Sequence, residues 1–245
     1  MTQLQGGHYD EESNLVISGA STAFDDQSVR RGFIRKVYAI LIAMLTLTFT
    51  VIIAFTTIPV LRTWGQTRVA LLVFVVLWLS AIVLMIVLIC NESLRRSYPQ
   101  NAIFLVVMTL IFSFALGITA SYSKPFIVLV AIATTLGIVI ALTIFAFQTK
   151  YDFTILTGIL FCVSISLLVF VILVVLLHSR VLYLVYATLG ACLISIYIVV
   201  DTQIMMSGKT VQLDPEEYVF AALNLYVDII MLFSYVLVLC GGGNQ

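Results

Sequence analysis

Long apolar segments separated by short charged turns dominate the pattern of this chain. A helix needs about 20 apolar residues to cross a bilayer, and the chain offers stretches of about that length repeatedly. They lie at residues 37–61, 69–90, 102–119, 126–148, 153–177, 181–203 and 215–240. Pro99 and Pro125 mark two of the turns between them. The pattern predicts an all-α membrane protein, a bundle of about seven transmembrane helices.

Composition strengthens this prediction. The 245 residues are 62% hydrophobic and 10% charged, whereas soluble domains carry roughly 25% charged residues. The chain therefore lacks the polar surface that water requires, and the lipid bilayer is its expected surrounding. The formal net charge is zero, so no bulk electrostatic field favours nucleic acid as a partner.

The first 29 residues differ from the rest of the chain. They contain five acidic residues among glycines and serines and have no apolar core, so they do not form a cleavable signal peptide. We expect two regions: a disordered acidic N-terminal tail at 1–29 and a seven-helix transmembrane domain at 30–245. The loops of that domain are too short to hold a folded soluble domain.

Basic residues are distributed unequally between the two sides of the predicted bundle. With a cytosolic N-terminus, eight Lys and Arg residues fall on the cytosolic side and four on the other. The cluster Arg30, Arg31, Arg35 and Lys36, just before the first span, dominates this bias. The positive-inside rule therefore predicts that the N-terminus is cytosolic. The last five residues carry no charged side chain, so a re-entrant final segment stays an alternative to a seventh span.

Two acidic residues, Asp201 and Asp228, lie well inside apolar stretches. An aspartate at the bilayer centre costs about 2.5–3.5 kcal/mol even on the lenient insertion scale. Such residues should face the bundle interior, a water-filled cavity or each other. Intramembrane acids are functional candidates by default.

The spacing of polar residues places both aspartates on defined helix faces. In the last segment, three- and four-residue steps join a polar stripe made of Glu217, Ala221, Asn224, Asp228, Met231 and Tyr235. In the sixth segment a matching face leads from Gly190 or Ala191 to Asp201, and its small residues allow a close neighbour. The last helix is therefore predicted to be an interior helix, with Asn224 and Glu217 supporting the aspartates.

The ends of these two helices complicate a meeting of the aspartates. Gly208 reads as the end of the sixth helix, and Asp214 and Glu217 read as a capping box at the start of the seventh. At ~1.5 Å per residue, Asp201 lies ~9 Å from its helix end and Asp228 ~20 Å from its own. They meet only if the helix ends are staggered or the sixth helix runs on. Glu217 is accordingly better explained as a capping residue than as a third ligand.

No Lys or Arg lies deep in a span to neutralise the aspartates. Two aspartates held close in a low dielectric cannot both ionise comfortably, so they would share a proton and titrate as a unit. A cation entering the site, or loss of the proton, would change that balance. The pair thus predicts a site that senses protons and attracts cations. The alternative is a pair of protonated or helix-capping aspartates with no transport role.

Other chemistry finds little support. The four cysteines, Cys90, Cys162, Cys192 and Cys240, form no C-x-x-C pair, and only two histidines exist, so a disulfide framework or a histidine metal site is not expected. No nucleophile–base pair or Gly-rich phosphate loop appears. The G-x-G-D setting of intramembrane aspartyl proteases is absent around both aspartates. We therefore expect neither an enzyme nor a bound cofactor.

Four motifs resemble the transmembrane Bax-inhibitor-motif family, within it the Lifeguard branch. They read RGFIRKVY, FAFQTKYDFT, VVDTQIMM and, most specifically, DPEEYVFAALNLYVDIIMLF. The resemblance implies a seven-helix bundle with a central last helix. The family's paired aspartates map onto Asp201 and Asp228, which also favours the stagger that brings them together. It further implies endoplasmic reticulum, Golgi or related membranes, suppression of apoptosis and a leak of calcium, with Asp201 and Asp228 as transient calcium ligands.

The leading hypothesis is thus a pH-sensitive calcium leak channel or exchanger of internal membranes, whose partners are the bilayer, calcium ions and protons. The alternative is a non-conducting adapter that inhibits cell death by binding apoptosis-regulatory or calcium-channel membrane proteins. A seven-helix receptor is disfavoured because the basic cluster is N-terminal and the final tail is five residues long. Retinal binding is disfavoured because the last helix has no Lys.

Overall fold

The computed structural model describes residues 6–91, 97, 99–207 and 218–241, with side chains from residue 30 onward. The described part consists of helices joined by short turns. The helices are α1 Gly6–Thr57, α2 Pro59–Gly65, α3 Arg68–Cys90, α5 Gln100–Ser121, α6 Pro125–Gln148, α7 Thr157–Leu177, α8 Arg180–Ser207 and α9 Tyr218–Gly241, with a 3₁₀ turn, η1, at Phe153–Leu156. Seven of these segments are long and apolar enough to cross a membrane. The prediction of an all-α bundle with seven spans is confirmed.

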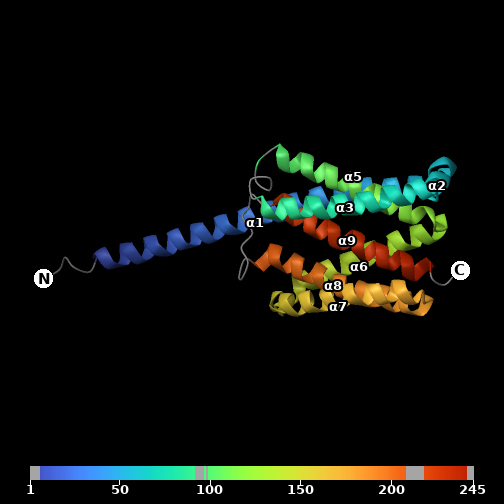
Figure 1. Ribbon diagram of the computed structural model, residues 1–245. Coiled ribbons are helices and arrows are strands. Elements are labelled where there is room, and N and C mark those ends of the chain that lie inside the picture. Colours follow the sequence, from blue (N-terminus) through green and yellow to red (C-terminus); the bar gives the residue numbers. More distant parts are fainter. Residues whose placement is uncertain (1–5, 92–96, 98, 208–217, 242–245) are drawn as a thin grey trace.

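The first span begins at Arg30 and ends at Thr57, where Pro59 starts the short helix α2. The backbone of α1 is already helical from Gly6 and projects beyond the bundle (Figure 1), although we expected residues 1–29 to be disordered. The boundary between a tail and a membrane domain at residue 30 stays a prediction.

The last helix, α9, is the centre of the bundle. It packs against α1, α5, α6 and α8, and Figure 1 shows it crossing between the other spans. Half of the residues in its most hydrophobic stretch are buried, 50% against 11% in the corresponding stretch of α3. Leu223, Tyr226, Ile229 and Phe233 are fully enclosed. The prediction that the last helix is central is confirmed, and its unbroken course from one end of the bundle to the other removes the re-entrant alternative.

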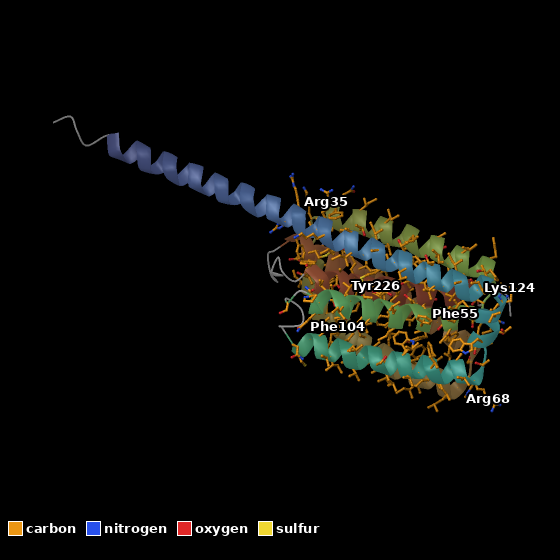
Figure 2. The ribbon with its side chains drawn as sticks, turned by 90° about the horizontal axis from the view of Figure 1, so that it is seen from above. Arg35, Phe55, Arg68, Phe104, Lys124 and Tyr226 are labelled. Atoms are coloured by element: carbon orange, nitrogen blue, oxygen red, sulfur yellow. The ribbon has the colours of Figure 1, made fainter. Side chains whose placement is uncertain are left out.

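Two helices, α3 and α7, lie at the periphery. The buried residues of α7 are Leu160, Leu167 and Val174, one every seventh position. A seven-residue repeat on a helix is a narrow stripe, so most of the α7 surface is apolar and exposed. In a soluble protein such a large apolar surface would promote aggregation, but in a bilayer it is the surface that lipid covers. Figure 2 shows basic residues near both ends of the bundle, Arg35 at one end and Arg68 and Lys124 at the other.

Candidate functional site

The site lies between α8 and α9, which pack closely because one of them carries a glycine at the contact. A Cβ atom built on Gly190 of α8 would lie 2.5 Å from Cζ of Tyr235 on α9. Only a residue without a side chain lets the Tyr235 ring lie there. The same ring stacks edge-on against Tyr186 at 5.7 Å between centroids. Gly190 and Tyr235 both belong to the polar and small-residue faces predicted from the sequence.

Further along the same interface, Asp201 of α8 and Asp228 of α9 share a side-chain hydrogen bond. The structure therefore brings together the two residues that sequence spacing selected. Ionised carboxylates only accept hydrogen bonds, so this contact requires a proton on one of them. Their role as an ion- or proton-sensing pair stays a prediction.

The surroundings of the pair are partly open. Asp201 and Asp228 are each half-buried, whereas the Oδ2 atom of Asp228 is buried and has no hydrogen-bond partner. A buried acceptor without a partner is uncommon in proteins and calls for an explanation, such as a proton, an ion or a water. The pair thus retains one unused acceptor directed into the protein.

The aspartates meet because the ends of their helices are staggered. Asp201 precedes the end of α8 at Ser207 by six residues, and Asp228 follows the start of α9 at Tyr218 by ten. At ~1.5 Å per residue these offsets are ~9 Å and ~15 Å. Since the two side chains are in contact, α9 begins about one turn beyond the end of α8. This is the arrangement that the sequence required for a meeting.

Two residues, Asn224 and Glu217, were predicted to support the aspartates, and the structure describes only the first of them. Asn224 is half-buried on α9, one turn before Asp228, in agreement with its place on the polar stripe. Glu217 lies outside the described residues, as do Asp214 and Gly208, so the predicted capping box stays a prediction.

The pair alone has too few ligand atoms for a resident calcium ion. Within the described part of the chain, no group of three or more His, Cys, Asp or Glu residues converges. Calcium takes six to eight oxygen ligands, and two carboxylates supply at most four. A calcium ion at Asp201 and Asp228 would have to keep several waters, which fits a transient ligand role better than a structural one.

A buried hydroxyl cluster, which the sequence analysis missed, joins α9 to α1 and α5. The Tyr226 hydroxyl lies 2.8 Å from Oγ1 of Thr48, which lies 2.9 Å from Oγ of Ser113. The Thr48 hydroxyl also lies within hydrogen-bond distance of its own helix, 2.9 Å from the Met44 carbonyl. A small polar residue on an otherwise apolar helix face was the available signal, but hydroxyls are common in membrane helices.

Gln203, two residues after Asp201, is a second missed residue. Its Oε1 accepts from the backbone N–H of Phe153 at 2.8 Å, and its Nε2 donates to the Tyr151 carbonyl at 2.8 Å. One side chain thereby fastens the turn between α6 and α7 to α8, near the aspartates. The signal was present, because Gln203 and Asp201 lie in the same short motif, VVDTQIMM.

Seven spans, of which the last is central, and an acid pair in contact between the last two define a multi-pass membrane protein. Residues 30–245 match the family described as inhibitor of apoptosis-promoting Bax1. The chain is 37% identical to protein lifeguard 3 of Homo sapiens, over 97% of this chain and 78% of that protein. The Mus musculus protein of the same name is 35% identical over 98% and 79% of the two chains. An Arabidopsis thaliana relative, protein LIFEGUARD 3, is 31% identical over 87% and 85%.

The chain therefore belongs to the Lifeguard and Bax-inhibitor family of anti-apoptotic membrane proteins. The resemblance stated from four short motifs is confirmed over most of the chain.

Proposed function

We propose that this protein is a pH-sensitive calcium leak channel or exchanger that dampens apoptosis from endoplasmic reticulum or Golgi membranes, with its N-terminus in the cytosol. The observation that carries the proposal is the hydrogen bond between Asp201 and Asp228 across the α8–α9 interface. We infer that the two carboxyls share a single proton, and that this bond adds to the packing that joins the two spanning helices.

The shared proton makes the α8–α9 contact depend on pH. While one carboxyl is protonated, it donates to the other and the helices stay together. Once the proton leaves, two like charges face each other where the dielectric is low, and they repel. We infer that deprotonation loosens α8 from α9 and opens a path for cations.

Calcium suits the deprotonated site. Carboxylate oxygens are hard ligands that calcium prefers, and Oδ2 of Asp228 has no partner within the described structure. The partial exposure of both residues supports access by a hydrated ion. The two carboxylates bind it too weakly to retain it, which is what conduction requires.

The first experiment is calcium efflux from proteoliposomes of the full chain between pH 5 and pH 8. For the natural sequence we expect the leak to rise with pH, because loss of the proton separates the pair. Asp228→Asn should give a low leak that does not vary with pH, since its amide donates to Asp201 without a titrating proton. Asp201→Asn should behave alike.

The matched control is Asp152→Asn, which removes an exposed carboxylate outside the bundle interior and should leave the pH profile unchanged. If neither interior substitution alters the pH profile of folded protein, the aspartate pair is not the sensor. If folded protein of natural sequence shows no leak above empty vesicles, the protein does not conduct. The adapter hypothesis, in which cell death is inhibited through protein contacts, would then replace the proposal.

A further inference from the structure

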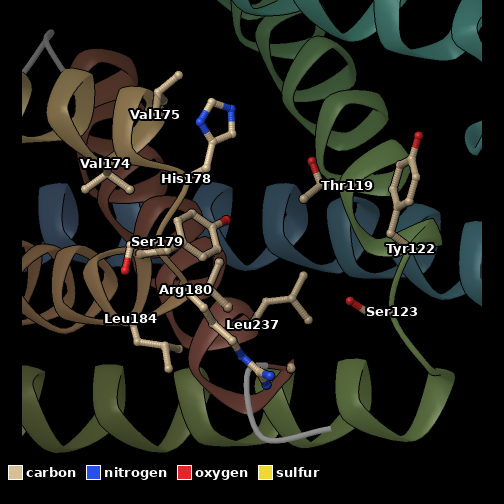
Figure 3. A pocket seen from close by; sticks show the side chains of 13 residues that line it. Thr119, Tyr122, Ser123, Val174, Val175, His178, Ser179, Arg180, Leu184 and Leu237 are labelled. Carbon is tan, nitrogen blue, oxygen red and sulfur yellow. The ribbon is translucent and has the colours of Figure 1, made fainter. Parts of the chain in front are cut away.

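A cavity of about 790 Å³ opens at the end of the bundle where α9 terminates. Figure 3 shows its lining side chains, which include Tyr183 and Leu184 of α8 and Leu237 and Val238 of α9. One water occupies about 30 Å³ in the liquid, so the cavity is large enough to admit hydrated ions. It therefore reaches one end of the α8–α9 interface, and the aspartate pair lies further along the same interface.

Two tyrosines lie between this cavity and the aspartate pair. On α9, Tyr235 follows Asp228 by seven residues and precedes Val238 of the cavity lining by three. On α8, Tyr186 follows Leu184 of the lining by two residues and precedes the acid of that helix by 15. Each helix thus carries a tyrosine between its acid and the cavity. A path that follows the interface from the cavity to the acids must pass both tyrosines.

The two tyrosines contact each other across the interface. The ring centroids of Tyr186 and Tyr235 lie 5.7 Å apart with the edge of one ring toward the other, and their hydroxyl oxygens lie 3.4 Å apart. The Tyr235 ring also fills the space that a side chain at Gly190 would need, so the backbone of α8 lies directly against it. Edge-to-face aromatic pairs add stability beyond the area that they bury. The interface is therefore tightly packed at this level.

We propose that Tyr186 and Tyr235 form a seal between the cavity and the aspartate pair, and that the cavity is the entrance through which hydrated cations approach the pair. This inference rests on the proposed function for its ion path, but the seal can be measured without a leak. In the proposed function, deprotonation loosens α8 from α9, and the same movement would draw the two rings apart. The open path would then be lined by hydroxyl oxygens and ring faces, which attract cations.

A purely structural contact between the tyrosines is the alternative, and a measurement of access distinguishes the two roles. Loss of either contact would lower stability, but only loss of a seal would let an aqueous reagent travel from the cavity toward the acids. Met231 is the position that reports this step. It lies one turn before Tyr235 and three residues after Asp228 on the polar stripe of α9, and it is half-buried.

The experiment measures the reactivity of a cysteine at Met231 in the full chain without its natural cysteines. A cationic, membrane-impermeant methanethiosulfonate is added to sealed vesicles in which the cavity end faces outward, at an acidic pH that keeps the proton on the aspartate pair. We expect Met231→Cys to react slowly and Val238→Cys, in the cavity lining, to react fast. Adding Tyr186→Leu should raise the rate at Met231→Cys about tenfold, because the aromatic contact no longer holds the interface closed.

Tyr197→Leu is the matched control, because it makes the same substitution on the same helix. The Tyr197 hydroxyl lies 3.1 Å from Oγ of Ser164 on α7, and its ring packs on the side of α8 that meets α7. This variant should leave the rate at Met231→Cys unchanged. Tyr186→Leu should leave the rate at Val238→Cys unchanged, which shows that the bundle and its cavity keep their fold.

Three outcomes would overturn the inference. If Met231→Cys reacts as fast as Val238→Cys while both tyrosines are present, the tyrosines do not seal the path. If Met231→Cys stays slow after Tyr186→Leu, the cavity does not lead to the acids past this residue. If Tyr197→Leu raises the rate as much as Tyr186→Leu, the effect is a general loosening of α8. Calcium efflux from the same vesicles is read separately, so that faster thiol labelling without a leak in any variant would end the proposed function and leave the seal standing.

Discussion

Tyr226 carries a hydroxyl on the most enclosed face of the central helix. Its exposed fraction is 0%, and its partner, Thr48, lies on the first span, far away in sequence. A polar group taken out of water without a partner costs free energy, so the contact specifies which face of α9 meets α1 and α5. Figure 2 shows Tyr226 inside the bundle, away from both charged ends.

Replacing Tyr226 by Phe removes the hydroxyl and keeps the ring, so it tests whether the hydrogen bond to Thr48 stabilises the bundle. We expect Tyr226→Phe to lower the free energy of unfolding by about 0.5–1.5 kcal/mol, since one buried hydrogen bond is lost and the ring is kept. A double-mutant cycle with Thr48→Val should give a coupling of about 0.6 kcal/mol, the mean for membrane hydrogen bonds. The measurement is reversible unfolding in mixed micelles.

Thr46→Val is the matched control, because Thr46 is exposed and its hydroxyl bonds only to the Ile42 carbonyl of its own helix. It should unfold like the natural sequence. A coupling of zero between Thr48 and Tyr226 would mean that the hydroxyl contact contributes nothing to stability.

The interior acids were predictable from the sequence, whereas the hydroxyl cluster was not. Asp201 and Asp228 stand out because a charge in an apolar segment is rare and costly. Thr48 and Ser113 do not, because a hydroxyl in a membrane helix can always bond to its own backbone. Only the three-dimensional arrangement shows that these two residues also bond across helices.

At the scale of helices, the contact between α8 and α9 depends on Gly190. Tyr235 fills the space that a side chain at this position would need. A similar close approach joins α1 to α5, where a Cβ atom on Gly117 would lie 2.7 Å from Cδ2 of Phe55. Small residues thus determine where aromatic side chains of a neighbouring helix can pack.

Gly190→Ala is expected to destabilise the bundle by about 1–3 kcal/mol, the usual cost of overpacking. The added methyl group would meet the Tyr235 ring, so either the ring or the whole of α8 must move. Gly137→Ala is the control: a Cβ at Gly137 meets nothing within 4 Å, and Ala favours helix by about 1 kcal/mol. Melting temperatures in detergent should therefore fall for Gly190→Ala and stay level or rise for Gly137→Ala. Equal melting temperatures would contradict the packing role of Gly190.

Most spans were predicted nearly to their ends, because hydrocarbon thickness limits helix length. The first is the exception: it was predicted at 37–61 but runs from Arg30 to Thr57, since Pro59 begins the separate helix α2. The predicted stretch at 69–90 became α3, Arg68–Cys90, and the stretch at 126–148 became α6, Pro125–Gln148. The position of each helix within the bundle was harder to predict from the sequence. The central place of α9 could be inferred from its polar stripe, but the peripheral place of α7 could not, because an apolar helix in lipid shows little difference between its faces.

At the scale of the whole molecule, seven spans place the two ends of the bundle in different aqueous compartments. The turn after α5 and the turn after α6 lie at opposite ends, separated by the 24 residues of α6, about 36 Å of helix. Tyr122 and Tyr151 are exposed in these turns, at 52% and 81%. They are a matched pair of positions for testing which end faces the cytosol.

We expect Tyr151 on the cytosolic side and Tyr122 on the opposite side, because the basic cluster at Arg30–Lys36 directs the N-terminus inward. In a cysteine-free background, Tyr151→Cys should react with a membrane-impermeant maleimide in sealed vesicles whose cytosolic face is outward. Tyr122→Cys should react only after detergent is added, and the background protein should not react at all. The reverse pattern would invert the molecule. Cations released by the aspartate pair, which lies toward the Ser207 end of α8, would then enter the opposite compartment.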